Sequence, residues 1–234
     1  MNGKLPRSPF AILWILAGFM LNCTQPTPIS ILFLGDSITE LGVKPDGYVT
    51  LIQKEIDRRF PKRDIKITGA GISGNKVPDL EARLKGDVLS KKPDIVVIYI
   101  GINDVWHSIL PGHSGTSQQD FRAGLLRIIE RIKKINAEII LCTPSLVGEK
   151  IDNGNPLDEQ LDEYSEIIRE LAAVEKLHLI DLRRQFKAYL LQNNPENRAE
   201  NILTYDGVHL NDRGNQFVAD VMIPTLIDLL EVSF

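Results

Sequence analysis

Five short, almost unbroken runs of Ile, Val and Leu recur along the 234-residue chain, and longer segments of helical periodicity lie between them. Such runs are typical of strands buried on both faces, because a strand with one wet face alternates apolar and polar residues. The expected strands are 29–34, 65–68, 95–100, 138–142 and 177–180. Helices are expected over 48–59, 77–91, 120–136, 157–176 and 211–230.

This alternation of strands and helices predicts an α/β fold, a three-layer α/β/α sandwich around a five-stranded parallel sheet. The length suits one well-buried domain. In sheets of this kind, ligands bind outside the carboxyl ends of the strands. Polar residues that directly follow the strands are therefore the first candidates for a functional site.

The N-terminal 28 residues are typical of a targeting segment rather than of the fold. Lys4 and Arg7 precede an uncharged apolar run, 10–21, which is too short to span a membrane. Cys23 follows, and 24–28 has the composition of a short tether. The pattern resembles a bacterial lipoprotein signal whose cysteine is lipidated, although Asn22 stands where a small residue usually precedes that cysteine. The alternative is a secretory signal with an incidental cysteine. Either way we expect an exported protein, with residues 1–28 as leader and 29–234 as one hydrolase domain.

Charge and cysteine content exclude several other classes of protein. The formal net charge is −4, whereas a nucleic-acid partner would need a basic patch. Cys142 is the one cysteine outside the leader, and it lies in an apolar run, so no disulfide framework is expected. No cluster of His, Cys and acidic residues has the spacing of metal ligands.

Three polar or glycine-rich segments follow successive predicted strands. Ser37 comes directly after the first strand, Gly74 after the second and Asn103 after the third. Each has an ordinary structural interpretation: Ser37 as a helix N-cap, Gly74 as part of a tight turn, and Asn103 as an Asx-turn. Because parallel strands end at one edge, all three are also expected to meet there.

Near the C-terminus, Asp206 and His209 lie three residues apart before the last predicted helix. At this spacing the carboxylate can accept from Nδ1–H of the imidazole, which leaves Nε2 free to take a proton from a hydroxyl. The structural alternative is a solvated histidine in a surface loop. His107 is a second candidate base, but no aspartate stands at a comparable offset from it.

Two other motifs fit known signatures poorly. Residues 69–74 spell GxGxxG, but they follow the second strand, Pro78 interrupts the next helix, and no acidic residue ends the following strand. Residues 112–116 approach the GxSxG nucleophile elbow, but the last residue is Thr116 and no strand precedes them.

Taken together, the four segments resemble the four blocks of the SGNH (GDSL-like) hydrolases, in the usual order. The matching residues are Gly35-Asp36-Ser37, Gly74, Gly101-Ile102-Asn103-Asp104 and Asp206-Gly207-Val208-His209. The resemblance covers about 29–230 and implies the flavodoxin-like fold of that family. Ile38 stands where the family often has Leu, a conservative departure.

The resemblance implies a serine esterase that forms an acyl-enzyme and needs no cofactor. By block position it assigns Ser37 as nucleophile, His209 as base and Asp206 as the partner of His209. The oxyanion hole would consist of the Ser37 N–H, the Gly74 N–H and the Asn103 side chain. Asp36, Trp106 and His107 are expected to border the substrate, and 105–117, 143–156 and 193–204 to form the pocket walls.

The family resemblance and the expected export limit the range of possible substrates. The family includes sugar O-acetyl esterases, lysophospholipases and thioesterases, and an exported location favours a carbohydrate or lipid ester. We expect an acetyl or short acyl ester. A protein tethered to a membrane through a lipid on Cys23 would meet such substrates outside the cell. The rival interpretation is a non-catalytic binding module on the same fold, although no triad residue is missing here.

Overall fold

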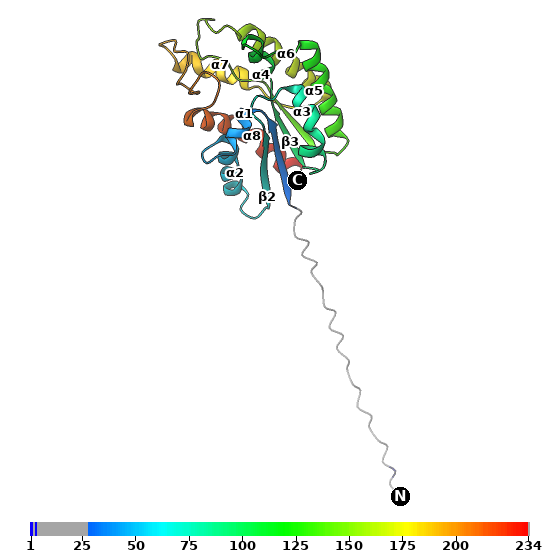
Figure 1. The fold of residues 1–234 in the computed structure, drawn as a ribbon. Helices are drawn as coiled ribbons and strands as arrows, with labels where there is room; N and C mark the ends of the chain where they lie inside the picture. The colour runs from blue at the N-terminus through cyan, green and yellow to red at the C-terminus, as the bar shows by residue number, and fades with distance from the viewer. Residues whose placement is uncertain (2, 4–27, 234) are drawn as a thin grey trace.

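The computed structural model describes residues 1, 3 and 28–233. Most of the predicted leader, Cys23 included, lies outside the described residues. The remainder forms a single parallel sheet with helices on both sides (Figure 1), which confirms the predicted α/β/α sandwich. No helix in the described part of the chain is long and apolar enough to cross a membrane.

The sheet has five parallel strands in the order β2-β1-β3-β4-β5. Their bounds are Ile29–Gly35 (β1), Ile65–Gly71 (β2), Ile95–Tyr99 (β3), Glu138–Cys142 (β4) and His178–Ile180 (β5). All five expected strands are confirmed. The central strands β1, β3 and β4 are buried almost throughout, as their unbroken apolar runs predict.

Helices α2 (Tyr48–Arg59) and α8 (Asp212–Ser233) pack against each other on one side of the sheet. The other side carries α3 (Val77–Leu84), α5 (Gln118–Lys133) and α6 (Asp158–Glu175), which pack side by side (Figure 1). These five helices match the expected ones within a few residues. The exception is the end of the 77–91 segment, where α3 gives way to a π-helical turn, η1 (Lys85–Leu89).

Four elements were not predicted from the sequence: α1 (Ser37–Gly42), α4 (Ile102–Trp106), the 3₁₀ turn η2 (His107–Ile109) and α7 (Leu182–Asn193). The first three are too short to show a helical period. Helix α7 buries Leu182, Phe186 and Leu190 on one stripe, but three basic residues lie between them in sequence.

The carboxyl end of β2 lies directly against α1, and a glycine makes that contact possible. A Cβ at Gly71 would lie 2.1 Å from the Glu40 nitrogen and 2.6 Å from the Asp36 oxygen. Any larger residue would therefore push the β2 edge away from the helix that Ser37 begins. The apparent dinucleotide motif at 69–74 thus contains glycines that close packing requires.

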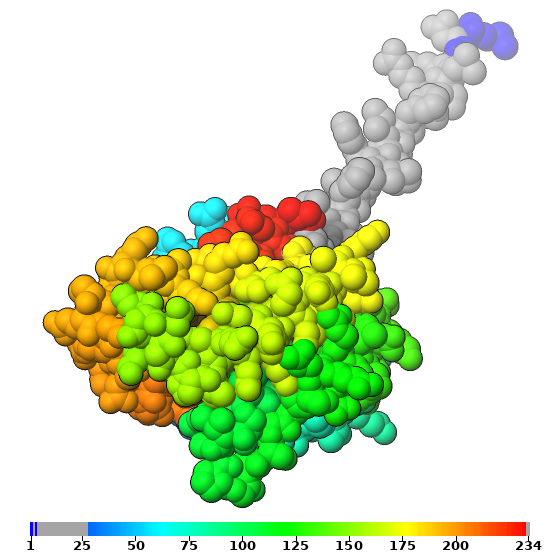
Figure 2. Space-filling model, turned by 90° about the horizontal axis from the view of Figure 1, so that it is seen from above, coloured from blue at the N-terminus to red at the C-terminus, as the bar shows by residue number. Residues whose placement is uncertain are grey.

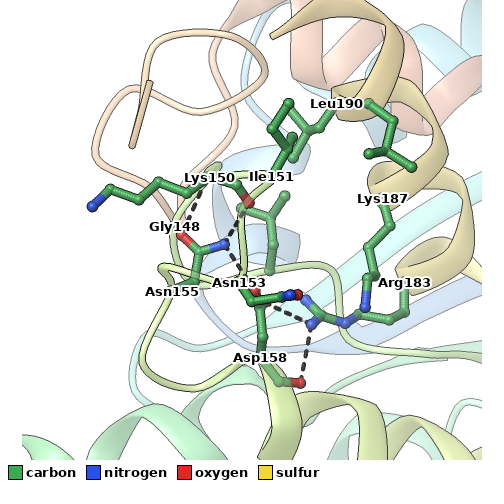
Figure 3. Close-up of a pocket in the computed structure, with 11 residues that line it drawn as sticks. Gly148, Lys150, Ile151, Asn153, Asn155, Asp158, Arg183, Lys187 and Leu190 are labelled. Atoms are coloured by element: carbon green, nitrogen blue, oxygen red, sulfur yellow. Dashed lines mark hydrogen bonds and ion pairs between the residues drawn. The ribbon is translucent and has the colours of Figure 1, made fainter. Parts of the chain in front are cut away.

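One charged side chain joins several elements beneath the surface. Arg183 on α7 is 1% exposed, and its guanidinium donates to Asp158, Asp162 and the Ser145 carbonyl. Figure 3 shows it beside Asp158, at the wall of a cavity of about 210 Å³. The three acceptors tie α7 to α6 and to the loop after β4.

We expect Arg183→Met to lower the free energy of unfolding by about 3 kcal/mol, because it leaves buried acceptors without their donor. Lys187→Met is the control, since Lys187 pairs with the same Asp162 at a half-exposed position. The Lys187–Asp162 ion pair should contribute less than about 1 kcal/mol to the free energy of unfolding. Urea unfolding of both variants measures the difference, and equal losses would contradict this account.

Candidate active site

Ser37 is the first residue of α1, and the preceding residue caps the helix. The Asp36 carboxylate accepts from the Ile38 N–H at 3.0 Å. The N-cap interpretation of Ser37 is therefore wrong, because Asp36 fills that position. The serine hydroxyl is left free for another partner, and the Ser37 N–H has no acceptor within the helix.

Asp206 and His209 lie in 194–211, the segment between α7 and α8, called here the histidine loop. One Asp206 oxygen accepts from the backbone N–H groups of Val208 and His209, at 3.0 and 2.7 Å. The other oxygen lies 2.7 Å from His209 Nδ1. The carboxylate thus fixes both the backbone and the ring of His209, as the three-residue spacing predicts.

The fold brings Ser37 and His209 together, although they are 172 residues apart in sequence. Ser37 Oγ and His209 Nε2 are separated by 3.0 Å. With Nδ1–H donating to Asp206, Nε2 is the nitrogen that can accept the serine proton. Among the described residues no hydrogen bond joins His107 to Ser37, so the geometry favours His209 as the base.

Gly74 and Asn103 also meet at this edge of the sheet. The Asn103 side chain donates to the carbonyl of Asn75 at 3.1 Å, which holds it beside the Gly74 turn. One amide hydrogen of Asn103 remains for a ligand. Gly74 has φ of +77°, a backbone conformation that favours glycine, and within 28–233 its N–H donates to no protein acceptor.

Arg83 on α3 binds the segments that carry these donors, and sequence reasoning missed it. Its guanidinium donates to the carbonyls of Gly35 at 2.7 Å and Ala70 at 2.9 Å, and to the Asn75 side chain at 2.7 Å. It therefore joins the ends of β1 and β2 to the Gly74 turn. An arginine within a helix has no sequence pattern that distinguishes this role from an ordinary surface position.

Aromatic rings flank His209. The Trp106 ring lies edge-on to the His209 ring at 6.3 Å between centroids, and the Tyr205 ring stacks on the His209 ring at 5.7 Å. Tyr205 is 51% exposed and was not predicted as a site residue. Tyr205 directly precedes Asp206, and this adjacency was the one feature of the sequence that could have identified it as a site residue.

His107 lies beside the Gly74 turn, where a Cβ at Gly74 would be 3.9 Å from its ring. Partial burial, the nearby His113 and the charge of Lys76 all lower the pKa of His107. Both Trp106 and His107 thus border the candidate site. Asp36, the third expected neighbour of the substrate, is instead 2% exposed and occupied in capping α1.

Two buried carboxyl groups lie under the site. Burial raises the pKa of Asp36 to about 7, against the opposing hydrogen bond from Ile38, and the nearby Asp104 carboxyl raises it further. Burial likewise raises the pKa of Asp104 to about 6, although the carboxyl accepts from the Val77 N–H. Neither carboxyl group has a salt-bridge partner among the described residues.

The pKa of Asp206 shifts in the opposite direction, downward. Burial opposes its ionisation, but hydrogen bonds from the imidazole and backbone of His209 outweigh burial and lower the pKa of Asp206. The group is therefore a carboxylate at neutral pH and can stabilise positive charge on the imidazole. Within the described part of the chain, no group of three or more His, Cys, Asp and Glu could hold a metal ion.

Two of the three expected pocket walls, 143–156 and 193–204, lie next to each other. In Figure 2 the segments near residue 150 (yellow-green) and residue 200 (orange) lie side by side, joined by hydrogen bonds from Gly148 to Gly207 and from Glu149 to Ala199. The cavity of Figure 3 lies between the 146–158 segment and α7, and neither Ser37 nor His209 lines it.

Residues 33–217 match the GDSL-like Lipase/Acylhydrolase family. The chain belongs to this family. It is a carboxylic ester hydrolase of the SGNH type. An acetylxylan esterase from Geobacillus stearothermophilus is 31% identical over 204 residues, which are 81% of this chain and 90% of that protein. "Uncharacterized lipoprotein YqeF" of Bacillus subtilis (strain 168) is 34% identical over 148 residues, 59% of this chain and 58% of that protein.

Solved structures agree with the family assignment. The crystal structure of the acetyl xylan esterase AlAXEase has a TM-score of 0.82 at 47% identity, covering 85% of this chain and 100% of its own. A catalytic mutant of Axe2, an acetylxylan esterase from Geobacillus stearothermophilus, has a TM-score of 0.73 at 28% identity, covering 88% and 94% of the two chains. The catalytic mutants of Axe2 replace a serine, an aspartate or a histidine by alanine, and its aspartate and histidine are three residues apart.

The raised pKa of Asp36 predicts that this residue makes the protein less stable as the pH rises, the reverse of the usual effect of an aspartate. Its folded-state pKa of about 7 exceeds the usual aspartate value of 3.8, so its contribution to stability is complete below about pH 4 and is lost as the pH rises through about 7. Asp36→Asn should therefore become more stable relative to the wild type, by about 2–3 kcal/mol, between pH 4.5 and 8.

Urea unfolding at both pH values measures this change. Asp228→Asn, an exposed substitution on α8, is the matched control for removing one carboxyl group. A constant difference between Asp36→Asn and the wild type would show that Asp36 has an ordinary pKa.

Proposed function

We propose that this chain removes acetyl groups from an acetylated carbohydrate, with Ser37 as nucleophile, His209 as base and Asp206 as the residue that orients His209. The observation that carries the proposal is the 3.0 Å contact between Ser37 Oγ and His209 Nε2, backed by the 2.7 Å contact between His209 and Asp206. The serine, aspartate and histidine replaced in the Axe2 catalytic mutants support it.

The chemistry follows from this geometry. His209 Nε2 takes the proton of Ser37 as Oγ attacks the ester carbonyl carbon, and the imidazolium then gives that proton to the departing alcohol oxygen. A water molecule, deprotonated by His209, attacks the acetyl-serine; the bond to Ser37 Oγ then breaks, His209 returns the proton to Oγ, and acetate is released. The Asp206 carboxylate stabilises the imidazolium in both halves of the reaction.

Three donors are available for the negative charge that develops on the carbonyl oxygen: the N–H groups of Ser37 and Gly74, and the free amide hydrogen of Asn103. They belong to three neighbouring strand ends, which Arg83 and the Asn103–Asn75 hydrogen bond hold in place. Donors held in place before the reaction stabilise the transition state without further reorganisation.

A carbohydrate ester is supported by the relatives and by the site surface. Both AlAXEase and the 31% identical Geobacillus protein are named acetylxylan esterases. Trp106 and Tyr205 place aromatic surface next to His209, where the alcohol part of the ester would lie. Rings of this kind combine an apolar face with a polar edge, which suits a sugar ring.

Export is part of the proposal. Residues 1–28 would act as a leader, with Cys23 lipidated and 29–234 forming the hydrolase domain. The positive residues and apolar run of the leader support this, as does the similarity to a protein named as a lipoprotein. A lipid at Cys23 would keep the enzyme at a membrane surface, where it meets polymeric or oligomeric substrates outside the cytoplasm.

Hydrolysis of p-nitrophenyl esters from acetate to decanoate, and of acetylated xylo-oligosaccharides, tests the function in purified residues 29–234. We expect the highest kcat/KM for acetate, and a fall of about 10⁴-fold or more in Ser37→Ala because triad residues act as a unit. Full activity in Ser37→Ala would refute the serine mechanism. A preference for long acyl chains would favour a lysophospholipase or thioesterase, and no activity in folded protein would favour a binding module.

Asn103→Ala tests the oxyanion role separately. Loss of one such donor is expected to reduce kcat by about 10²–10³-fold with little change in KM, because the donor acts mainly in the transition state. Gln216→Ala, which removes an exposed carboxamide on α8, is the control and should match the wild type. A kcat for Asn103→Ala within about threefold of wild type would remove Asn103 from the oxyanion hole.

A further inference from the structure

The histidine loop carries two of the three proposed triad residues, yet it contains little regular structure. It spans 194–211 and forms one isolated bridge, between Thr204 and Leu210. The hydrogen bonds of Asp206 to Val208 and His209 lie within the loop. They set the shape of the loop but not its distance from Ser37, which lies on a different element. Another contact must set that distance.

Glu149 makes that contact. It lies in the segment that follows β4, is 0% exposed, and directs its carboxylate into the histidine loop. Three successive backbone N–H groups, those of Ile202, Leu203 and Thr204, donate to it at 2.7 Å each. The Thr204 hydroxyl donates to it as well, at 2.8 Å.

These contacts continue to the triad residues. The same Thr204 oxygen accepts from the Gly207 N–H at 3.1 Å, and Gly207 directly follows Asp206. The Gly207 carbonyl accepts from the Gly148 N–H at 2.8 Å. Glu149 and its neighbour therefore hold the loop on both sides of Asp206, close to the point where the His209 ring is fixed.

The backbone of Glu149 is also fixed by hydrogen bonds. Its N–H donates to the Ala199 carbonyl at 2.9 Å, and its carbonyl accepts from the Asn194 side chain at 2.7 Å. Asn194 is 1% exposed and also donates to and accepts from Arg198. A buried carboxylate with four donors is stable only while all of them are in place, so the loop and Glu149 require each other.

We propose that Glu149 is a positioning residue for ester hydrolysis: its carboxylate docks 202–204 and so keeps His209 Nε2 within hydrogen-bonding distance of Ser37 Oγ. The inference rests on the proposed function of Ser37 and His209. A misplacement of a catalytic group by about 1 Å can cost about 100-fold in rate, so a contact remote from the substrate can control turnover.

Glu149→Gln tests this with the smallest change of shape. A carboxamide has one accepting oxygen and an NH₂ group that cannot accept, so one of the four donors loses its acceptor. At 15 °C, with both proteins folded by circular dichroism, we expect kcat for p-nitrophenyl acetate to fall about 10- to 100-fold and KM to change less than about twofold. Glu130→Gln, an exposed substitution on α5 away from the site, should match the wild type.

Thr204 provides a second test if Glu149→Gln fails to fold. Thr204→Val removes the hydroxyl that links Glu149 to Gly207 but keeps the volume, and kcat should fall about 5- to 20-fold. Thr204→Ser retains the hydroxyl and should restore kcat. A variant that lowers the melting temperature but leaves kcat and KM unchanged at 15 °C would overturn the positioning role.

Coupling to His209 separates positioning from general stability. In a His209→Ala background, Glu149→Gln should cause no further loss of kcat, because the group that it positions is absent. An additive loss would overturn the proposal. Failure of the proposed function would be distinguishable, since the wild type would then be inactive or Ser37→Ala would remain active.

Discussion

The alignment of the strand ends in the central sheet is the constraint on which the site depends. Strands β1, β2 and β3 pair in parallel, and their register places Gly35 opposite both Gly71 and Tyr99. The three strands therefore end level with one another, and the residues that follow them emerge at one edge. Ser37, the Gly74 turn and Asn103 lie together for this reason.

The sheet edge positions Ser37, the Gly74 turn and Asn103, but polar side-chain contacts are needed to hold these segments and the histidine loop in place. Arg83 joins the carbonyls at the ends of β1 and β2 to the Gly74 turn. Glu149 docks the histidine loop through four hydrogen bonds. Both side chains are charged and both act on backbone groups. A side chain with a full set of hydrogen-bond partners permits little movement, because each lost contact leaves an unsatisfied group.

The fold followed closely from the sequence. Apolar runs identified all five strands, and helical periodicity located the longer helices, because both patterns reflect burial directly. Helix α7 was missed because its few apolar residues are separated in sequence by basic ones, and one of these basic residues, Arg183, is itself buried. Ser37 had a second interpretation as a helix N-cap, which the local sequence alone could not exclude. In the structure the Ile38 N–H donates to the Asp36 carboxylate, so Asp36 is the N-cap.

By itself the sequence determined the α/β architecture, the family resemblance and the pairing of Asp206 with His209, because these depend on periodicity, residue type and short spacing. Only the tertiary structure decided which histidine faces Ser37, that Asp36 is buried beneath the site, and that Tyr205, Arg83 and Glu149 surround or support it. Those facts depend on contacts between residues far apart in the chain. Such contacts form only after the sheet has brought its strand ends to one edge and the loops have closed over it.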